Sequence, residues 1–138
     1  MPYIYETMKA FSNIYSEKND CAVISVAIVT DSNYTDTHRL FERLGRKKGG
    51  STNMPNIIRA VNKRGYKLVC IDKYINKIKK MKGSGVTTCT ISRYLDNDKA
   101  YLVGTSGHIA AFKEGELHDW SSNRKLRVIE LWEAVKVK

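Results

Sequence analysis

Apolar residues follow a helical pattern in the first half of the chain. A dense apolar run from Cys21 to Val29 comes directly after Asp20, whose carboxylate can accept hydrogen bonds from the free N–H groups of a first helical turn. A run of this length is compatible with a strand or a buried helix, and we interpret it as a helix that is apolar nearly all round and therefore central in the fold. Further helices, each opened by a capping residue, are expected over Thr35 to Leu44, Asn53 up to Gly65 and Asp72 to Met81.

The second half of the chain favours strands. A first strand is predicted over Tyr66 to Ile71, and a tight turn at Glu114-Gly115 joins two later ones. The other predicted strands are Val86 to Thr90, Tyr101 to Thr105, His108 to Lys113, Leu117 to Trp120 and Leu126 to Val135. We therefore expect a single α+β domain over residues 1–138, with N-terminal helices and a buried central helix packed on a C-terminal antiparallel sheet.

Composition narrows the class of protein. The chain has 138 residues, of which 42% are hydrophobic and 28% charged, as in an ordinary globular domain. It contains no apolar run of about 18 residues, so we expect no membrane contact. The three cysteines, Cys21, Cys70 and Cys89, have no paired spacing. We expect a cytoplasmic protein with no disulfide framework, no metal and no cofactor.

The positive charge is concentrated in one segment. The formal net charge is +10, and residues 39–82 alone carry 14 Lys+Arg against two acids. Such a segment can attract a nucleic acid or an acidic protein by its long-range field, or it can be a solvated face that keeps the protein soluble. The residues expected to contact a partner are Arg46, Lys47, Lys48, Lys79 and Lys80.

Three residues have the chemistry of a catalytic thiol site. Cys21 is predicted to open the central helix, where the partially positive helix end favours a thiolate. A nucleophilic thiol needs a base, and the base needs an orienting acceptor. The predicted hairpin places position 110 or 111 opposite Asp119, so Asp119 and His108 can meet as diagonal neighbours. His118 is expected to point away from Asp119, toward the surface.

The chain resembles the papain-like cysteine peptidase superfamily. The resemblance is carried by Asn19-Asp20-Cys21-Ala22, by Gly104-Thr105-Ser106-Gly107-His108-Ile109-Ala110-Ala111 and by Glu114-Gly115-Glu116-Leu117-His118-Asp119-Trp120. The chain looks most like the small papain-like proteins of bacteria and their phages. The resemblance implies a papain-like fold and a thiol hydrolase, either peptidase, amidase or acyl transferase, that acts on a peptide or a host or viral protein. Cys21 would be the nucleophile, His108 the general base and Asp119 its orienter.

The oxyanion hole departs from the family pattern. Papain-like enzymes usually supply a glutamine several residues before the cysteine, but positions 14–18 contain none. The resemblance then assigns the oxyanion to the Cys21 backbone N–H and the nearest side-chain amide, Asn19. Loss of one such donor typically costs about 10²–10³ in turnover.

Structural roles are the alternatives to each catalytic assignment. Cys21 can be a small core residue, His108 a hydrogen-bonded histidine at a strand edge, and Asp119 the partner of Arg124. Cys70 and Cys89 lie in apolar runs and are expected to be inert. If the catalytic assignments fail, the alternative function is an inactive papain-fold binding module that uses residues 39–82 on nucleic acid or an acidic protein.

Overall fold

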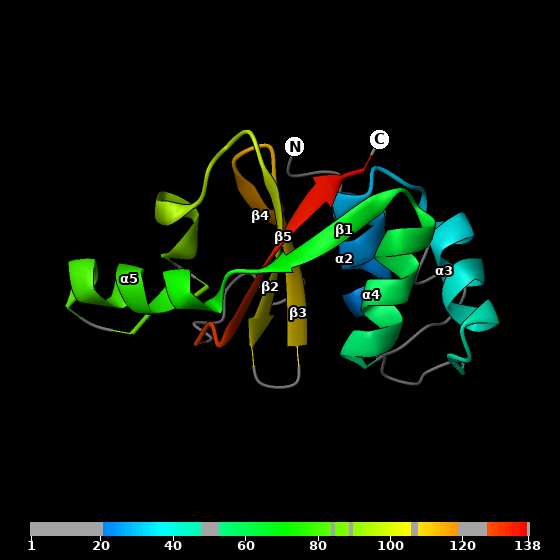
Figure 1. Ribbon diagram of the computed structural model, residues 1–138, viewed down its shortest axis with the longest axis horizontal. Coiled ribbons are helices and arrows are strands. Elements are labelled where there is room, and N and C mark those ends of the chain that lie inside the picture. Colours follow the sequence, from blue (N-terminus) through cyan, green and yellow to red (C-terminus); the bar gives the residue numbers. More distant parts are fainter. Residues whose placement is uncertain are drawn as a thin grey trace.

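Five antiparallel strands form one sheet in the order β1-β5-β2-β3-β4 (Figure 1). The computed structural model describes residues 21–47, 53–83, 85–88, 90–105, 108–118 and 127–137. The strands are β1 (Tyr66–Cys70), β2 (Ala100–Thr105), β3 (His108–Lys113), β4 (Glu116–His118) and β5 (Glu130–Lys136). The sheet brings the last strand of the chain between β1 and β2, so β1 joins a sheet whose other members all come from the C-terminal part of the chain.

The helices agree with the apolar pattern, with small shifts at their ends. They are α2 (Cys21–Val29), α3 (Tyr34–Arg43), α4 (Met54–Lys63) and α5 (Asp72–Lys82), with a 3₁₀ helix η1 (Ile91–Tyr94). Every residue of α2 after Cys21 is buried, as expected for a central helix. Asn53 caps α4 as predicted, because its side chain accepts from the Asn56 N–H. The cap of α3 is Asn33 rather than Thr35, with its side chain accepting from the Asp36 N–H at 2.8 Å.

Asp72 has a different role from the predicted helix cap. The residue before α5 in the cap position is Ile71, and no side chain caps this helix. The Asp72 Oδ1 instead accepts a hydrogen bond of 2.8 Å from the backbone N–H of Leu131 on β5. The Ile71 N–H donates to the Leu131 carbonyl at 2.9 Å, so the pairing of β1 with β5 continues past Cys70 and ends on the Asp72 carboxylate. This contact fixes the start of α5 against the sheet.

The C-terminal hairpin is close to the prediction. Glu114 and Gly115 have φ of 54° and 81°, the left-handed pair that a two-residue hairpin turn requires. The register places Ala111 opposite His118 and Lys113 opposite Glu116. The predicted strand over residues 86–90 is absent from the described residues there, which form only a bridge from Thr87 to Arg127.

Both faces of the sheet are covered, and each face has its own apolar cluster. Leu102, Ile109 and Ala111 pack with α2, α3 and α4 in one cluster. Their sequence neighbours Val103 and Phe112 pack in a second cluster with Ile78, Ile91 and other residues. Figure 1 shows α2, α3 and α4 on one side of the sheet and α5 on the other. The α+β class and the central buried helix on an antiparallel sheet are therefore confirmed.

Candidate functional site

Cys21 is the first residue of α2 and the first residue that the structure describes. Its side chain is half-buried and packs against the apolar cluster around α2. In the sheet, α2 packs on β3 and β2, and its contact with β3 is the more extensive of the two. Cys21 thus lies at one end of a helix that rests on the strand beginning at His108.

Two hydrogen bonds fix the direction of α2 relative to β3. The Ser25 hydroxyl, one helical turn after Cys21, donates to the backbone carbonyl of Ile109 at 3.3 Å. At the other end the Lys113 ammonium donates to the Ile28 carbonyl at 3.0 Å and lies 3.3 Å from Asp31 Oδ1. The helix and the strand therefore run in the same direction.

This direction places the first residues of α2 and β3 at the same end of the packed pair. Because Ser25 is next to the second residue of β3, Cys21 lies one turn toward the end at which His108 begins the strand. For His108 only the backbone is described. Asp119 and the oxyanion candidate Asn19 both lie outside the described residues.

His118 is buried, contrary to the expectation that it lies at the surface. Its exposed fraction is 4%, and it sits opposite Ala111, a member of the cluster that packs on α2. Burial lowers the pKa of His118 below its usual 6.5, against the opposing influence of Glu116. Among the described residues its Nε2 has no hydrogen-bond partner. The structure thus adds a second histidine to the β3–β4 hairpin, on the face of the sheet that α2 covers.

The two described cysteines differ in exposure. Cys70, expected to be inert in an apolar strand, is exposed at the end of β1. It belongs to the edge strand of the sheet, so no strand among those described covers its outer side. Cys89 lies outside the described residues. Any measurement of thiol reactivity therefore has to separate Cys21 from a second accessible cysteine.

The basic segment is only partly available to a partner. Arg46 is 7% exposed, and its backbone N–H donates to the Phe41 carbonyl at 2.9 Å, so its burial removes it from the expected contact residues. Lys47, Lys79 and Lys80 are exposed, and Lys48 lies outside the described residues. Of the expected contact residues, those that the structure leaves exposed are thus lysines on α5 and in the loop after α3.

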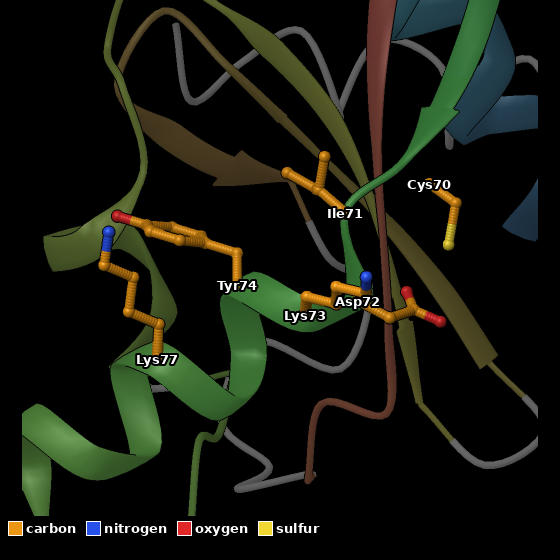
Figure 2. Close-up of a pocket in the computed structure, with 6 residues that line it drawn as sticks. All are labelled: Cys70, Ile71, Asp72, Lys73, Tyr74 and Lys77. Carbon is orange, nitrogen blue, oxygen red and sulfur yellow. The ribbon is translucent and has the colours of Figure 1, made fainter.

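A cavity of about 640 Å³ lies where β1 passes into α5 (Figure 2). Its lining residues are Cys70, Ile71, Asp72, Lys73, Tyr74 and Lys77. The Tyr74 hydroxyl donates to the Tyr94 carbonyl at 2.6 Å and ties α5 to η1, which holds one wall in place. The sequence carries no signal of this cavity, because it arises where a strand passes into a helix and the apolar pattern of each element does not encode how the two elements are set.

Comparison of the chain with known families found no matching family model, and comparisons with curated proteins and with solved structures found no match. In the described part of the chain, no helix has the length and apolar character to cross a membrane. No group of three or more His, Cys, Asp and Glu residues in that same part could hold a metal ion.

Proposed function

We propose that the chain is a papain-like thiol hydrolase whose nucleophile is Cys21. The observation that carries this proposal is the packing of α2 on β3, with the Ser25–Ile109 hydrogen bond setting the two elements in parallel. That packing brings the start of a buried helix and the start of the adjacent antiparallel strand to the same end of the sheet, and the β3 residues in the apolar cluster around α2 are Ile109 and Ala111. The resemblance in the segments around Cys21, His108 and Asp119 supports the same arrangement.

The proposed reaction is attack on an acyl group. The Cys21 thiolate adds to the carbonyl carbon of a peptide or related amide, and His108 donates its proton to the departing amine. The resulting thioester is then hydrolysed by a water molecule that His108 deprotonates, which releases the acid and regenerates the Cys21 thiolate beside a protonated His108. Asp119 orients the imidazole, and the Cys21 N–H with the Asn19 amide holds the oxyanion. The substrate class is a peptide or a protein.

The first test is the rate at which each cysteine reacts with iodoacetamide near neutral pH, resolved by peptide mass spectrometry. An ordinary thiol is only about 3% ionised at pH 7, so a cysteine activated by a base reacts on the order of tenfold faster. Accessibility alone predicts the reverse order here, because Cys70 is exposed and Cys21 is half-buried. We expect Cys21 to react faster than Cys70 despite this difference.

Two histidine variants make the test specific. His108→Gln should reduce the rate at Cys21 to that of Cys70 or below, while the rate at Cys70 stays constant. His118→Gln is the matched control, because it removes a histidine from the neighbouring strand β4 and should leave Cys21 unchanged. The proposal fails if Cys21 reacts more slowly than Cys70 in the wild type, and the base is misassigned if only His118→Gln slows the reaction.

A further inference from the structure

The outer edge of β1 presents unpaired main-chain groups in the sheet of described strands. β1 is the first strand in the sheet order and pairs on one side only, with β5. Hydrogen bonds from the Val137 N–H to Gly65 at 2.8 Å and from the Ile71 N–H to Leu131 at 2.9 Å mark both ends of this pairing. In an antiparallel ladder the residues that exchange hydrogen bonds alternate.

This alternation identifies the outward-facing residues. Gly65 and Ile71 bond to β5, so the odd-numbered residues between them do the same. The backbone N–H and C=O groups of the alternate residues then point away from β5, toward the free edge. Those residues are Tyr66, Leu68 and Cys70. Such a row is the template to which an extended peptide can add as a further strand.

The free edge leads directly into the 640 Å³ cavity at the start of α5. Cys70 belongs to both the edge and the cavity wall, and Ile71 and Tyr74 provide apolar walls beyond it. Next to Cys70, Val69 is 38% exposed, which is unusual for a large apolar residue in this chain. We call the β1 edge together with this cavity the β1 edge surface. This surface offers main-chain hydrogen-bonding groups along the strand and an apolar pocket at the end of the same strand.

The charge around the β1 edge surface selects the kind of peptide. Lys67 on the strand and Lys73 and Lys77 at the cavity are all exposed. The lining also contains one acidic residue, Asp72, whose Oδ1 accepts from the Leu131 N–H at 2.8 Å, and the two lysines outnumber it. Pairing of two copies of this chain along β1 would bring these lysines together in molecules that each carry a net charge of +10. An acidic strand from a partner can pair with the same main-chain groups of β1 without this charge repulsion.

We infer that the β1 edge surface binds an extended acidic segment of a partner protein, which adds to β1 as a sixth strand and places an apolar side chain in the cavity. The edge hydrogen bonds and the apolar walls favour a peptide over a nucleic acid, because phosphate binding needs the lysines alone. The β1 edge surface contains none of the proposed catalytic residues, so the inference stands independently of the proposed hydrolase.

The test uses a fluorescein-labelled synthetic peptide of alternating Glu and Val with one central Leu, and fluorescence anisotropy with the full chain. We expect binding that weakens as salt is raised. The same peptide with Lys in place of Glu should bind at least about tenfold more weakly. An analogue N-methylated at alternate residues keeps every side chain but cannot pair with the edge, and it should lose at least about tenfold as well. Bound peptide should also slow the alkylation of Cys70.

Two pairs of variants locate the binding site. Cys70→Pro removes an outward N–H without touching the β5 ladder and should weaken the peptide by about tenfold, whereas Cys70→Ala keeps the N–H and should change affinity by less than about twofold. The double variant Lys73→Glu/Lys77→Glu should weaken binding by about tenfold. Lys47→Glu/Lys79→Glu makes the same change in net charge at exposed lysines outside the cavity and should have a much smaller effect. Circular dichroism confirms that each variant is folded.

Three outcomes would overturn the inference. The first is no binding of the acidic peptide. The second is equal binding of the N-methylated analogue, which would mean that the edge is not used. The third is that a single-stranded oligothymidine binds more tightly than the acidic peptide, and that Lys73→Glu/Lys77→Glu weakens this binding while Cys70→Pro does not. The surface would then bind nucleic acid.

Discussion

The buried histidine of β4 makes the stability of the fold depend on pH in a defined direction. His118 is 4% exposed, and burial lowers its pKa below the usual 6.5, opposed by Glu116, the Lys113 backbone and Glu114. When the pH falls below 6.5, the unfolded chain takes up a proton that the folded chain excludes. The contribution of the neutral imidazole to stability is therefore fully present above that pH and is lost as the pH falls toward the folded pKa.

The size of the effect follows from one proton. While the unfolded chain is protonated and the folded chain is not, the free energy of unfolding falls by at most about 1.4 kcal/mol per pH unit. Against a typical domain stability of about 5–15 kcal/mol, this slope is measurable within one or two pH units. His118 is 4% exposed and lies opposite Ala111, so burial disfavours the protonated ring in the folded chain.

The assay is urea unfolding at a series of pH values between about 7.5 and 5, for the wild type and for His118→Gln. Carboxylates contribute an acid slope to both proteins, so the difference between the two curves isolates the imidazole. We expect the wild type to lose stability relative to the variant as the pH falls. His38→Gln is the control, because it removes a histidine 3.0 Å from Glu42 Oε1 on α3 and should leave the His118 slope in place. Parallel curves for the wild type and His118→Gln would refute the reasoning.

Three further changes test the packing by urea or thermal unfolding. Phe112→Ala should lower the free energy of unfolding by about 3–5 kcal/mol, because Phe112 is fully buried and packs against Tyr101, with ring centroids 5.7 Å apart and ring planes tilted by 60°. A loss below about 1 kcal/mol would contradict the core assignment. Asp72→Ala should cost about 1–3 kcal/mol by leaving the Leu131 N–H unpaired, and Asp72→Asn should cost less because it keeps an acceptor. Gly115→Ala should cost about 1 kcal/mol, because φ is +81° there and a Cβ would lie 3.3 Å from Asn97; an unchanged melting temperature would argue against the turn geometry.

The elements with a long periodic pattern could be predicted from the sequence. The run from Cys21 to Val29 suited a strand or a buried helix by its length, and its position after the capping residue Asp20 favoured the helix; α2 is buried along all the residues after Cys21. The cap of α3 was two residues off, because Asn33 and Thr35 are both capping types and the choice depends on which side chain reaches a free N–H. The Asp72 side chain does not cap α5 as predicted, because it accepts a hydrogen bond from the buried Leu131 N–H, which needs an acceptor.

The burial of His118 and the exposure of Cys70 could not be predicted, for a common reason. Alternation along a strand separates two faces but does not say which face is covered, and here helices cover both. Alternation predicted His118 on the opposite face from Asp119, and the face that His118 shares with Ala111 is the one on which α2 packs. Cys70 was expected only to be inert in an apolar run; it is exposed on β1, the edge strand of the sheet, and edge position depends on strand order rather than on local sequence.

The two proposals concern different parts of the sheet, and strand order makes them separable. β1 is separated from β3 by β5 and β2, so the two strands are about 14 Å apart at the usual strand spacing. A peptide added at the outer edge of β1 lies farther still from the start of β3. Its residues that pair with Tyr66–Cys70 therefore cannot contact Cys21. Removal of the thiol in Cys21→Ala should therefore leave peptide affinity unchanged, and Lys73→Glu/Lys77→Glu should leave the alkylation rate of Cys21 unchanged. A loss of peptide binding in Cys21→Ala would mean that the acidic segment occupies the thiol site itself, and the β1 edge surface would then have no role of its own.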